Sequence, residues 1–304
     1  MAALSLNAPA IQWYPGHIAK AEKALEEALA KVDLVIEVRD ARIPLATGHP
    51  RLQRWIRGKH HLLVLNRRDM VPAAAQEAWT AWFRSQQQPV WWCDAKAGTG
   101  VKQLQQAAIR AGEALNTRRR QRGMRRRPVR ALMLGFPNVG KSALINRLVR
   151  QKVVDSARRA GVTRSLRWVR LGQELDLLDA PGVLPPRLDD QGAALRLAIC
   201  DDIGQAAYDG EAVALAFLEV LHTMESHAHA AIPADLLHRR YGTDPASISG
   251  STPGSRGSAW LAAAATRHTS GDGPRMAQKL LDDFRRNQLG AIALEWPPTG
   301  EVIK

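Results

Sequence analysis

The stretch Gly135–Ser142 holds the residue types that bind a polyphosphate. Its sequence, Gly-Phe-Pro-Asn-Val-Gly-Lys-Ser, fits the pattern G-x-x-x-x-G-K-[ST] without a mismatch. Glycines let the backbone pass close to phosphate groups, so that main-chain N–H groups and the positive end of a helix dipole face the anion. In this pattern Lys141 reaches the β- and γ-phosphates, and the hydroxyl of Ser142 binds Mg²⁺. The stretch therefore predicts a nucleoside triphosphate site.

The residues on either side supply the strand and the helix that such a loop needs. Residues 129–134 form an apolar run typical of a buried strand, and residues 143–148 have the pattern of the first turns of a helix. The alternative, a glycine-rich turn that matches by chance, does not predict this order of elements. We therefore expect the loop to bind a nucleotide.

A polar tetrapeptide, Asn66-Arg67-Arg68-Asp69, follows the apolar strand pattern of residues 61–65. It resembles the N-K-x-D element with which GTPases read guanine. The carboxylate of Asp69 can accept hydrogen bonds from both N1–H and the exocyclic amine of guanine, a pair of donors that adenine lacks. We expect Asn66 to tie the element to neighbouring loops, and Arg67, in place of the usual lysine, to stack on the base. The element favours GTP and disfavours an ATPase.

A third loop begins where the strand pattern of residues 89–93 ends. Its sequence, Asp94-Ala95-Lys96, is similar to the S-A-K element of GTPases, in which a backbone N–H meets guanine O6 and the lysine stem packs on the ring. Asp94 stands where serine is more frequent. This loop predicts a second contact with guanine.

Two later segments fit the elements that sense a γ-phosphate. Thr163 lies in a basic, glycine-bearing segment and fits the switch threonine whose hydroxyl completes Mg²⁺ coordination when the γ-phosphate is present. Two short strand patterns follow, at residues 166–171 and 174–178, and the second leads into Asp179-Ala180-Pro181-Gly182, which matches D-x-x-G. We expect Asp179 near the Mg²⁺ shell and the N–H of Gly182 at the γ-phosphate.

The spacing of apolar residues predicts two structural parts. Up to residue 184 strand patterns alternate with helical ones, which predicts an α/β domain with a mostly parallel sheet and flanking helices. From residue 185 onward only helical periodicity remains, at 192–203, 211–226, 233–240, 257–267 and 275–289. We therefore place a GTPase domain at 1–184 and a small all-α domain, expected to bind RNA or the ribosome, at 185–304.

The guanine-reading elements precede the phosphate loop, whereas in ordinary GTPases they follow it. A parallel α/β sheet tolerates such a circular permutation, because the original termini lie close together at the surface and can be joined while the chain opens elsewhere. The expected fold class is thus α/β, a circularly permuted P-loop GTPase domain followed by a small all-α domain. The D-x-x-G element then lies next to the helical domain in sequence, so a change at the γ-phosphate can be passed to that domain.

The charge of the chain points to an anionic partner. The 304 residues carry a formal net charge of +14 and a sequence pI near 10.5, which favours nucleic acid as a partner. A surplus of arginine without a partner is the alternative. Eight arginines lie within residues 118–130, after a helix expected at 101–116. This run is either a solvated stretch or a phosphate-contacting linker, and both remain open.

Cysteine use and hydropathy bound the compartment. Cys93 and Cys200 are too few for a disulfide framework or a cysteine-rich zinc site, which favours a reducing compartment. Residues 1–10 lack the basic start and apolar core of a secretory signal, and no uncharged apolar stretch is long enough to span a bilayer. We expect a cytoplasmic protein with no membrane partner.

Taken together, these blocks resemble the circularly permuted ribosome biogenesis GTPases of the RbgA/YlqF family. The resemblance covers residue 11 nearly to the end and rests on Trp13–Ala21, Asp40–Pro44, Asn66–Asp69, Gly135–Ser142 and Asp179–Gly182. It implies a GTPase that binds a late precursor of the large ribosomal subunit, with the helical domain contacting ribosomal RNA. It also implies that GTP hydrolysis drives a late assembly step and release of the protein. Related permuted GTPases with an OB-fold and a zinc domain fit less well, because the sequence has no cluster of zinc ligands.

The resemblance also implies how hydrolysis proceeds. Val183 occupies the place of the glutamine that orients water in many GTPases, and an apolar side chain cannot orient water. The family is proposed to use the histidine of its P-G-H block instead, here His17. By itself, a lone histidine near a helix start is more often a surface or capping residue. The P-loop asparagine, here Asn138, is implied to hold K⁺ near the phosphates and so to supply the charge of an arginine finger.

The predicted site therefore has three sets of residues. His17 and Lys141 are the predicted catalytic residues. Ser142, Thr163 and Asp179 are expected around Mg²⁺, and Asn138 at K⁺. Contacts with GTP or GDP are expected from Asn66, Arg67, Arg68, Asp69, Asp94, Ala95, Lys96, Asn138, Val139, Gly140, Lys141, Ser142, Ala143, Thr163 and Gly182.

We expect a monomeric GTPase, and one alternative of another class remains open. The protein could be an RNA-binding assembly chaperone whose nucleotide site is structural and does not turn over. The altered residues Arg67 and Asp94 lend this reading slight support. The intact residues Lys141, Ser142, Thr163 and Asp179 argue against it.

Overall fold

A computed structural model of the chain describes residues 25–150, 166–182, 185, 189–204, 208–233, 235–243 and 256–298. Contacts between residues divide the chain into two compact units. The sheet unit contains the described parts of Trp13–Arg68 and Thr80–Arg187, and the helical unit contains Asp69–Trp79 and the described parts of Leu188–Lys304. This division is not continuous in sequence, since it assigns Asp69–Trp79 to the helical unit. The domain boundary after residue 184 therefore stays a prediction.

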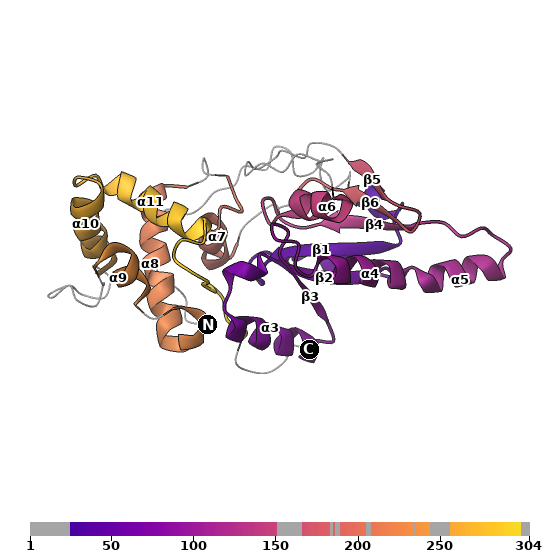
Figure 1. Ribbon diagram of the computed structural model, residues 1–304, viewed down its shortest axis with the longest axis horizontal. Helices are drawn as coiled ribbons and strands as arrows, with labels where there is room; N and C mark the ends of the chain where they lie inside the picture. The colour runs from indigo at the N-terminus through magenta and orange to yellow at the C-terminus, as the bar shows by residue number, and fades with distance from the viewer. Residues whose placement is uncertain are drawn as a thin grey trace. The chain divides into compact units, whose positions relative to one another are not determined.

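A six-stranded sheet forms the centre of the sheet unit (Figure 1). Its strand order is β3-β2-β1-β4-β6-β5. All neighbours pair in parallel except β5, which lies antiparallel to β6 at the edge. The strands are β1 (Leu34–Asp40), β2 (His60–Asn66), β3 (Val90–Cys93), β4 (Val129–Leu134), β5 (Arg167–Leu171) and β6 (Leu175–Asp179).

The inner strands have long apolar runs because helices or loops cover both faces of a parallel sheet. On one face, Val35, Leu132 and Leu178 pack against the residue pair Leu52 and Ile56, and against the helical residues 25–29. This burial of aliphatic side chains is the main contribution to the stability of the unit. The expected mostly parallel sheet with flanking helices is therefore confirmed.

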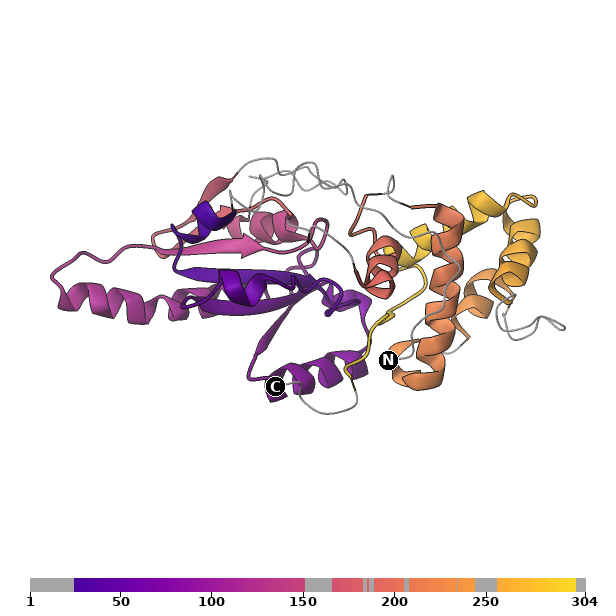
Figure 2. The same cartoon turned by 180° about the vertical axis from the view of Figure 1, so that it is seen from behind.

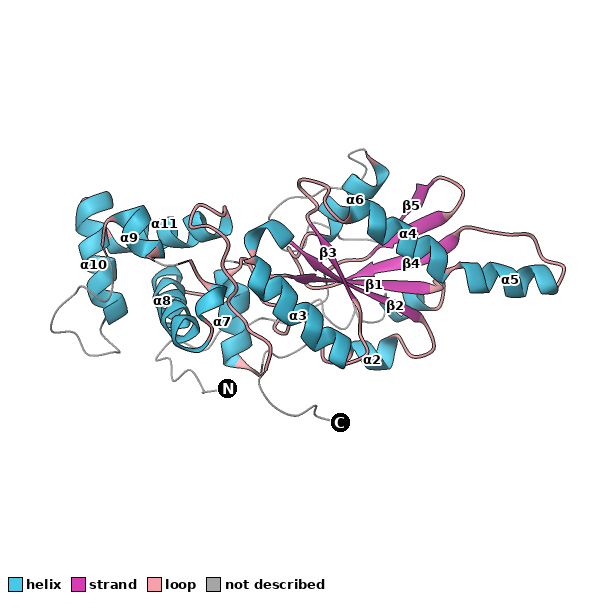
Figure 3. Cartoon of the chain, turned by 60° about the horizontal axis from the view of Figure 1, so that its bottom comes forward, coloured by secondary structure: helices cyan, strands magenta, loops and turns pink. Residues whose placement is uncertain are grey.

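Six further described helical segments begin in the sheet unit or reach it. They are α2 (Leu52–Trp55), η1 (Arg68–Met70), α3 (Ala73–Ser85), α4 (Val101–Ala111), α5 (Glu113–Gln121) and α6 (Lys141–Val149). Figure 3 shows α4 and α6 on one side of the sheet and α2 on the other. The helix expected at 101–116 is divided at Gly112, and helical structure continues as far as Gln121. Three of the eight arginines in the run, Arg118, Arg119 and Arg120, thus lie in α5.

The helical unit contains α7 (Gln191–Ile199), α8 (Gly210–His227), η3 (His229–Ala231), α9 (Leu236–Tyr241), α10 (Arg256–His268) and α11 (Gly273–Arg285). Three helices begin with an aspartate whose side chain accepts a hydrogen bond from the third helical N–H, a strong start signal: Asp190, Asp209 and Asp272. Helices α8 and α11 lie side by side (Figure 2). They pack through Phe217 and Phe284, whose ring centroids are 4.7 Å apart.

The topology positions the candidate site. Since β2, β3, β4 and β6 run parallel, their carboxyl ends lie at the same edge of the sheet, which is where open α/β sheets bind ligands. The loops that begin with Asn66, Asp94, Gly135 and Asp179 all start at this edge. The chain therefore brings the starts of four predicted elements together although up to 113 positions separate them (179 − 66).

Candidate nucleotide-binding site

The phosphate loop joins β4 directly to α6. Gly140 precedes the first residue of α6 with a φ of 98°, a left-handed conformation that favours glycine. A Cβ atom there would lie 2.2 Å from Nδ2 of Asn66, so only glycine allows this approach. The loop thus presents the N-terminal N–H groups of α6, with the positive end of the helix dipole, at the carboxyl edge of the sheet.

Lys141 lies inside the curve of this loop. Its side chain is buried, and Nζ donates hydrogen bonds to the carbonyl oxygens of Gly135 at 3.0 Å and Phe136 at 2.6 Å. The loop therefore holds an ammonium group among its own backbone amides. This arrangement suits an anion of high charge density, such as a polyphosphate.

Asn66 joins the phosphate loop to the third loop. Its Nδ2 donates to the carbonyl oxygen of Val139 at 2.9 Å, and its Oδ1 accepts from the backbone N–H of Ala95 at 3.1 Å. Both ends of the buried amide are thus satisfied by loops that lie 44 positions apart (139 − 95). The tie that the sequence predicted for Asn66 is present.

Asp179 ends β6 beside the phosphate loop. In the sheet it is level with Met133 of β4, and its side chain is buried. Burial raises the pKa of Asp179 to about 6, although the positive charges of Lys141 and Arg167 lower it. Neither carboxylate oxygen has a hydrogen-bond partner among the residues that the structure describes.

A hard cation is the ligand that such a carboxylate suits. Mg²⁺ prefers oxygen ligands, commonly one or two carboxylates, and keeps water in its other positions. Asp179, with the hydroxyl of Ser142 at the start of α6, therefore fits Mg²⁺. GTPases in general use this ion.

Gly182 brings the D-x-x-G segment against the phosphate loop. A Cβ atom on Gly182 would lie 2.7 Å from both Cα and N of Pro137, which is closer than side-chain atoms approach a backbone. A larger residue would push the two segments apart. The predicted γ-phosphate sensor and the phosphate loop are thus in direct contact.

Comparison with known proteins identifies the family. A family model described as a 50S ribosome-binding GTPase matches residues 130–229. The probable ribosome biogenesis GTPase A of Mycoplasma pneumoniae is 30% identical over 198 residues, which cover 65% of this chain and 69% of that protein. Ribosome biogenesis GTPase A of Bacillus cereus is 38% identical over 217 residues, which cover 71% of this chain and 72% of that protein. The chain belongs to the ribosome biogenesis GTPase A family.

A solved structure supports the fold assignment. The GNP-bound YlqF from T. maritima superimposes with a TM-score of 0.59 and 20% identity, over 91% of this chain and 98% of that one. The likeness agrees with the permuted order of elements. The predicted family, fold class and GTPase activity are confirmed, and a guanine nucleotide and a ribosome-related partner follow from family membership.

Arg67 departs from the lysine usual in this element, and the structure gives its guanidinium a specific task. Nη1 donates to Oδ2 of Asp40 at 2.6 Å, and Nη2 donates to the carbonyl oxygen of Asn138 at 2.5 Å. The predicted stacking on the base stays a prediction. A lysine would have to make both contacts from one nitrogen, whereas the planar guanidinium makes them from two separate nitrogens.

Asp40 anchors this link from inside the protein. Its fully buried carboxylate also accepts from the guanidinium of Arg42 at 3.0 and 2.7 Å and from the backbone N–H of Arg42 at 2.9 Å. Burial would raise the pKa of Asp40, but the charges of Arg42 and Arg67 and these hydrogen bonds hold it at about 2. The Asp40–Pro44 block of the family therefore fixes the phosphate loop through Arg67.

Asp94 replaces serine in the third loop and closes it locally. Its Oδ1 accepts from the backbone N–H groups of Lys96 at 2.7 Å and Ala97 at 3.1 Å. Aspartate readily forms such turns because its short side chain reaches its own backbone two or three residues on. The side chain of Lys96 is exposed, and its packing on guanine stays a prediction.

The described structure does not place three predicted site residues, Asp69, His17 and Thr163, with the loops of the nucleotide site. Asp69 is exposed in η1 and belongs by its contacts to the helical unit, where its carbonyl oxygen accepts from Asn287 at 3.4 Å. Its role in reading guanine stays a prediction. His17 and Thr163 lie outside the described residues.

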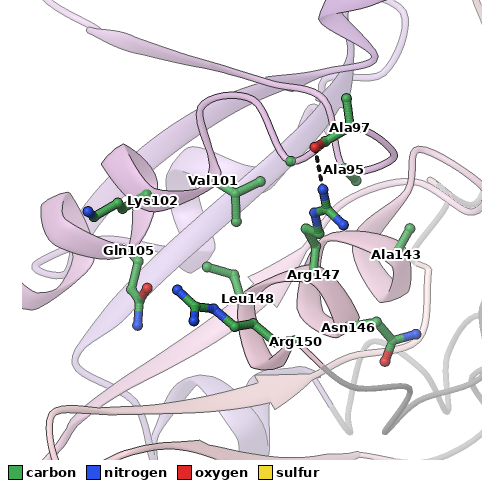
Figure 4. Close-up of a pocket in the computed structure, with 11 residues that line it drawn as sticks. Ala95, Ala97, Val101, Lys102, Gln105, Ala143, Asn146, Arg147, Leu148 and Arg150 are labelled. Carbon is green, nitrogen blue, oxygen red and sulfur yellow. Dashed lines mark hydrogen bonds between the residues drawn. The ribbon is translucent and has the colours of Figure 1, made fainter.

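A cavity of about 750 Å³ lies between the third loop, α4 and α6 (Figure 4). It includes Ala95 and Ala143, two predicted nucleotide contacts, and adds the cations Lys102, Arg147 and Arg150. The guanidinium of Arg147 donates to the carbonyl oxygen of Ala97 and so bridges α6 to the third loop. We did not foresee these cations from the sequence, although Ala143 and Arg147 are four residues apart and share a helix face.

Within the part of the chain that the structure describes, we find no helix that is both long enough and apolar enough to cross a membrane. The predicted compartment and the predicted monomeric state stay predictions.

We expect the substitution Asn66→Ala to weaken binding of GTP and GDP about tenfold, because two loops lose their common partner and must be ordered by the nucleotide instead. Titration with a fluorescent guanine nucleotide measures the change. Asn116→Ala is the matched control, since Asn116 is also buried and also bonds a distant backbone segment through both amide atoms, to Arg127. Equal loss of affinity in both variants would contradict a specific role for Asn66.

We expect Asp40→Asn to lower the free energy of unfolding by about 3–5 kcal/mol, because it leaves two guanidinium groups facing a neutral buried amide. Denaturant unfolding measures this change. Glu174→Gln removes a carboxylate whose pair with Arg126 is exposed, and should cost less than about 1 kcal/mol. A small effect of Asp40→Asn would show that Asp40 does not anchor the loop.

Proposed function

We propose that this GTPase binds a late precursor of the large ribosomal subunit, and that GTP hydrolysis drives a late assembly step and release of the protein. The observation that carries this proposal is the contact of Gly182 with Pro137, a few residues before Leu188, where the chain enters the C-terminal part of the helical unit. A segment that senses the γ-phosphate thus continues directly into the unit proposed to contact the particle. A change in the nucleotide has a short covalent route to that unit.

Family and charge support the choice of partner. The matching family model is described as 50S ribosome-binding, and the relatives are named for ribosome biogenesis. The net charge of +14 gives the protein the sign that attracts ribosomal RNA. Together these observations favour a large-subunit particle over a protein substrate.

The residues of the site divide the work of hydrolysis. Lys141 and the amides of the phosphate loop hold the β- and γ-phosphates, and Ser142 and Asp179 hold Mg²⁺. Mg²⁺, when bound, neutralises charge that develops on the phosphate oxygens. Asp40 and Arg67 keep the loop in place, so that little reorganisation is needed when the nucleotide binds.

Two further residues complete the proposal. Val183 stands where many GTPases carry a water-orienting glutamine, and we assign that task to His17 on the basis of the family resemblance. We also propose that Asn138 holds K⁺ near the phosphates.

We expect GTP turnover to be slow for the protein alone and to rise at least tenfold with large-subunit precursor particles, in K⁺ more than in Na⁺. Phosphate release at saturating GTP measures the rate, and small-subunit particles are the control. Turnover that is independent of particles would contradict the coupling. Equal rates in K⁺ and Na⁺ would contradict the proposed role of K⁺ without affecting the proposed coupling to the particle.

We expect His17→Ala to lower the particle-stimulated rate about a hundredfold while nucleotide affinity changes less than about twofold, since a general base contributes to the rate and not to binding. His60→Ala, at an exposed position, is the control and should leave both quantities unchanged. A collapse of nucleotide affinity in His17→Ala would mean that the histidine is structural.

A further inference from the structure

A basic projection lies at the end of β4 opposite the nucleotide loops. We call residues 113–128, which comprise α5 and the return to β4, the arginine arm. Figures 1 and 3 show α5 extending beyond the ends of the strands. The nucleotide site does not use this segment.

Hydrogen bonds hold the arm in a defined shape. The buried amide of Asn116 donates to the carbonyl oxygen of Arg127 at 3.1 Å and accepts from its N–H at 3.2 Å. The guanidinium of Arg127 forms a fork with both oxygens of Asp33, at 2.7 and 2.8 Å. Nearer the tip, Nε of Arg119 donates to the carbonyl oxygen of Arg125 at 3.1 Å. The two sides of the arm are thus clamped together and to the sheet unit.

The outer side chains of the arm carry positive charge that no carboxylate of the described residues neutralises. Arg118, Arg120, Arg122 and Arg125 are exposed, and no ion pair within 4 Å joins them to a carboxylate of the described residues. Glu113 is the one acidic residue of the arm sequence. Four exposed guanidinium groups on a preorganised support suit an extended anion.

An exposed tryptophan continues this surface onto the edge of the sheet. The arm meets the β5–β6 turn through Arg126, which bonds to Glu174 at 3.2 Å. Arg130 on β4 and Trp168 on β5 are separated by β6, and the guanidinium of Arg130 lies over the ring of Trp168, 5.7 Å from its centroid. Trp168 is 44% exposed, and Met124 at the tip of the arm is 40% exposed; they are the exposed large hydrophobic residues of the described chain.

We propose that the arginine arm and Trp168 together form an RNA-binding surface, in which the arginines contact phosphates and Trp168 stacks on an unpaired base. Stacking on an aromatic ring beside a cationic track is how proteins hold single-stranded nucleic acid. That the RNA is ribosomal rests on the proposed function, whereas the surface itself rests on the contacts above.

An alternative is that these residues protect the edge strand β5 from pairing with another sheet. This alternative explains fewer of the observations. Charged residues on β5, such as Arg167 and Arg170, do discourage pairing with another sheet. An exposed tryptophan on the same edge has the opposite effect, and the arm arginines lie outside the strand. RNA accounts for the ring and the charges together, since it offers both bases and phosphates.

The first experiment measures binding of the full-length protein to two short RNAs, a duplex and a hairpin with an unpaired loop, by fluorescence anisotropy over a range of salt. The arm variant carries Arg120→Gln, Arg122→Gln and Arg125→Gln. The control variant carries Arg54→Gln, Arg57→Gln and Arg84→Gln, exposed positions of the sheet unit that remove the same charge elsewhere.

For the arm variant we expect at least a tenfold loss of affinity for both RNAs and a salt slope smaller by about 2, because each lost phosphate contact removes about 0.7–0.9 from the slope. The control variant should change affinity less than threefold. Equal losses of RNA affinity in both triple variants would overturn the arm as a binding site, because net charge alone would then explain the binding. The same titration is repeated with polyglutamate as an acidic polypeptide. If the arm variant loses binding to polyglutamate but not to RNA, the partner of the arm is an acidic protein and the RNA assignment is overturned.

Trp168→Ala tests the stacking contact. We expect about tenfold weaker binding to the hairpin and unchanged binding to the duplex, with most of the loss restored by Trp168→Phe. Equal binding of wild type and Trp168→Ala to the hairpin would overturn the stacking contact. GTP affinity should be unchanged in every variant, which also confirms folding.

Sedimentation with large-subunit precursors separates this inference from the proposed function. If the wild type binds particles and the arm variant binds them equally well, the arm inference fails and the proposed function stands. If the wild type does not bind particles but the arm variant still loses affinity for the short RNAs, the proposed function fails and the RNA-binding surface stands.

Discussion

The candidate site depends on the amide of Asn66, which holds two loops of different strands at a fixed distance. Each loop follows its own parallel strand, and the sheet alone fixes only where the loops begin. The hydrogen bonds to Val139 and Ala95 remove the remaining freedom, because one buried side chain cannot satisfy both partners in any other arrangement. Arg67, the next residue, adds a second tie by joining the phosphate loop to buried Asp40. The end of β2 is therefore both part of the binding site and the support for its neighbours.

Much of this architecture could be predicted from local sequence. The strand at residues 129–134 and the phosphate loop after it are where the patterns indicated, since apolar runs and glycine spacing are local properties. The helices expected at 211–226 and 257–267 agree with α8 and α10 within one residue at each end. Periodicity of 3.6 residues is a strong signal in helices that bury one face.

Contacts over long sequence distance could not be predicted in the same way. Arg67 gave no sign that its partners would be Asp40 and the carbonyl oxygen of Asn138, because a tetrapeptide does not specify what lies across the sheet edge. The break at Gly112 was also missed, although glycine is itself a poor helix former. A Cβ atom there would lie 1.8 Å from Cγ2 of Val129, so the close approach to β4 requires glycine, and this contact is not visible in the local sequence. The same holds for the cations that line the cavity beside Ala143, which come together only when α4 and α6 pack.

The position of the arginine arm follows from the circular permutation. In the ordinary order of a GTPase, β4 would come first and the helix after the third loop would come last, so no chain would join α4 to β4. Permutation creates this connection, and it has to cross the surface at the amino end of β4. Such a connection has few residues in the core; in the arm, Asn116 is the buried residue of α5. The remaining positions can therefore become arginine without loss of core packing. The length of β4, roughly 17 Å for its few residues, then separates the basic arm from the phosphate loop. Trp168 on β5 pairs with Leu178, one residue before Asp179, so the proposed RNA surface runs from the arm along the edge of the sheet toward the nucleotide end.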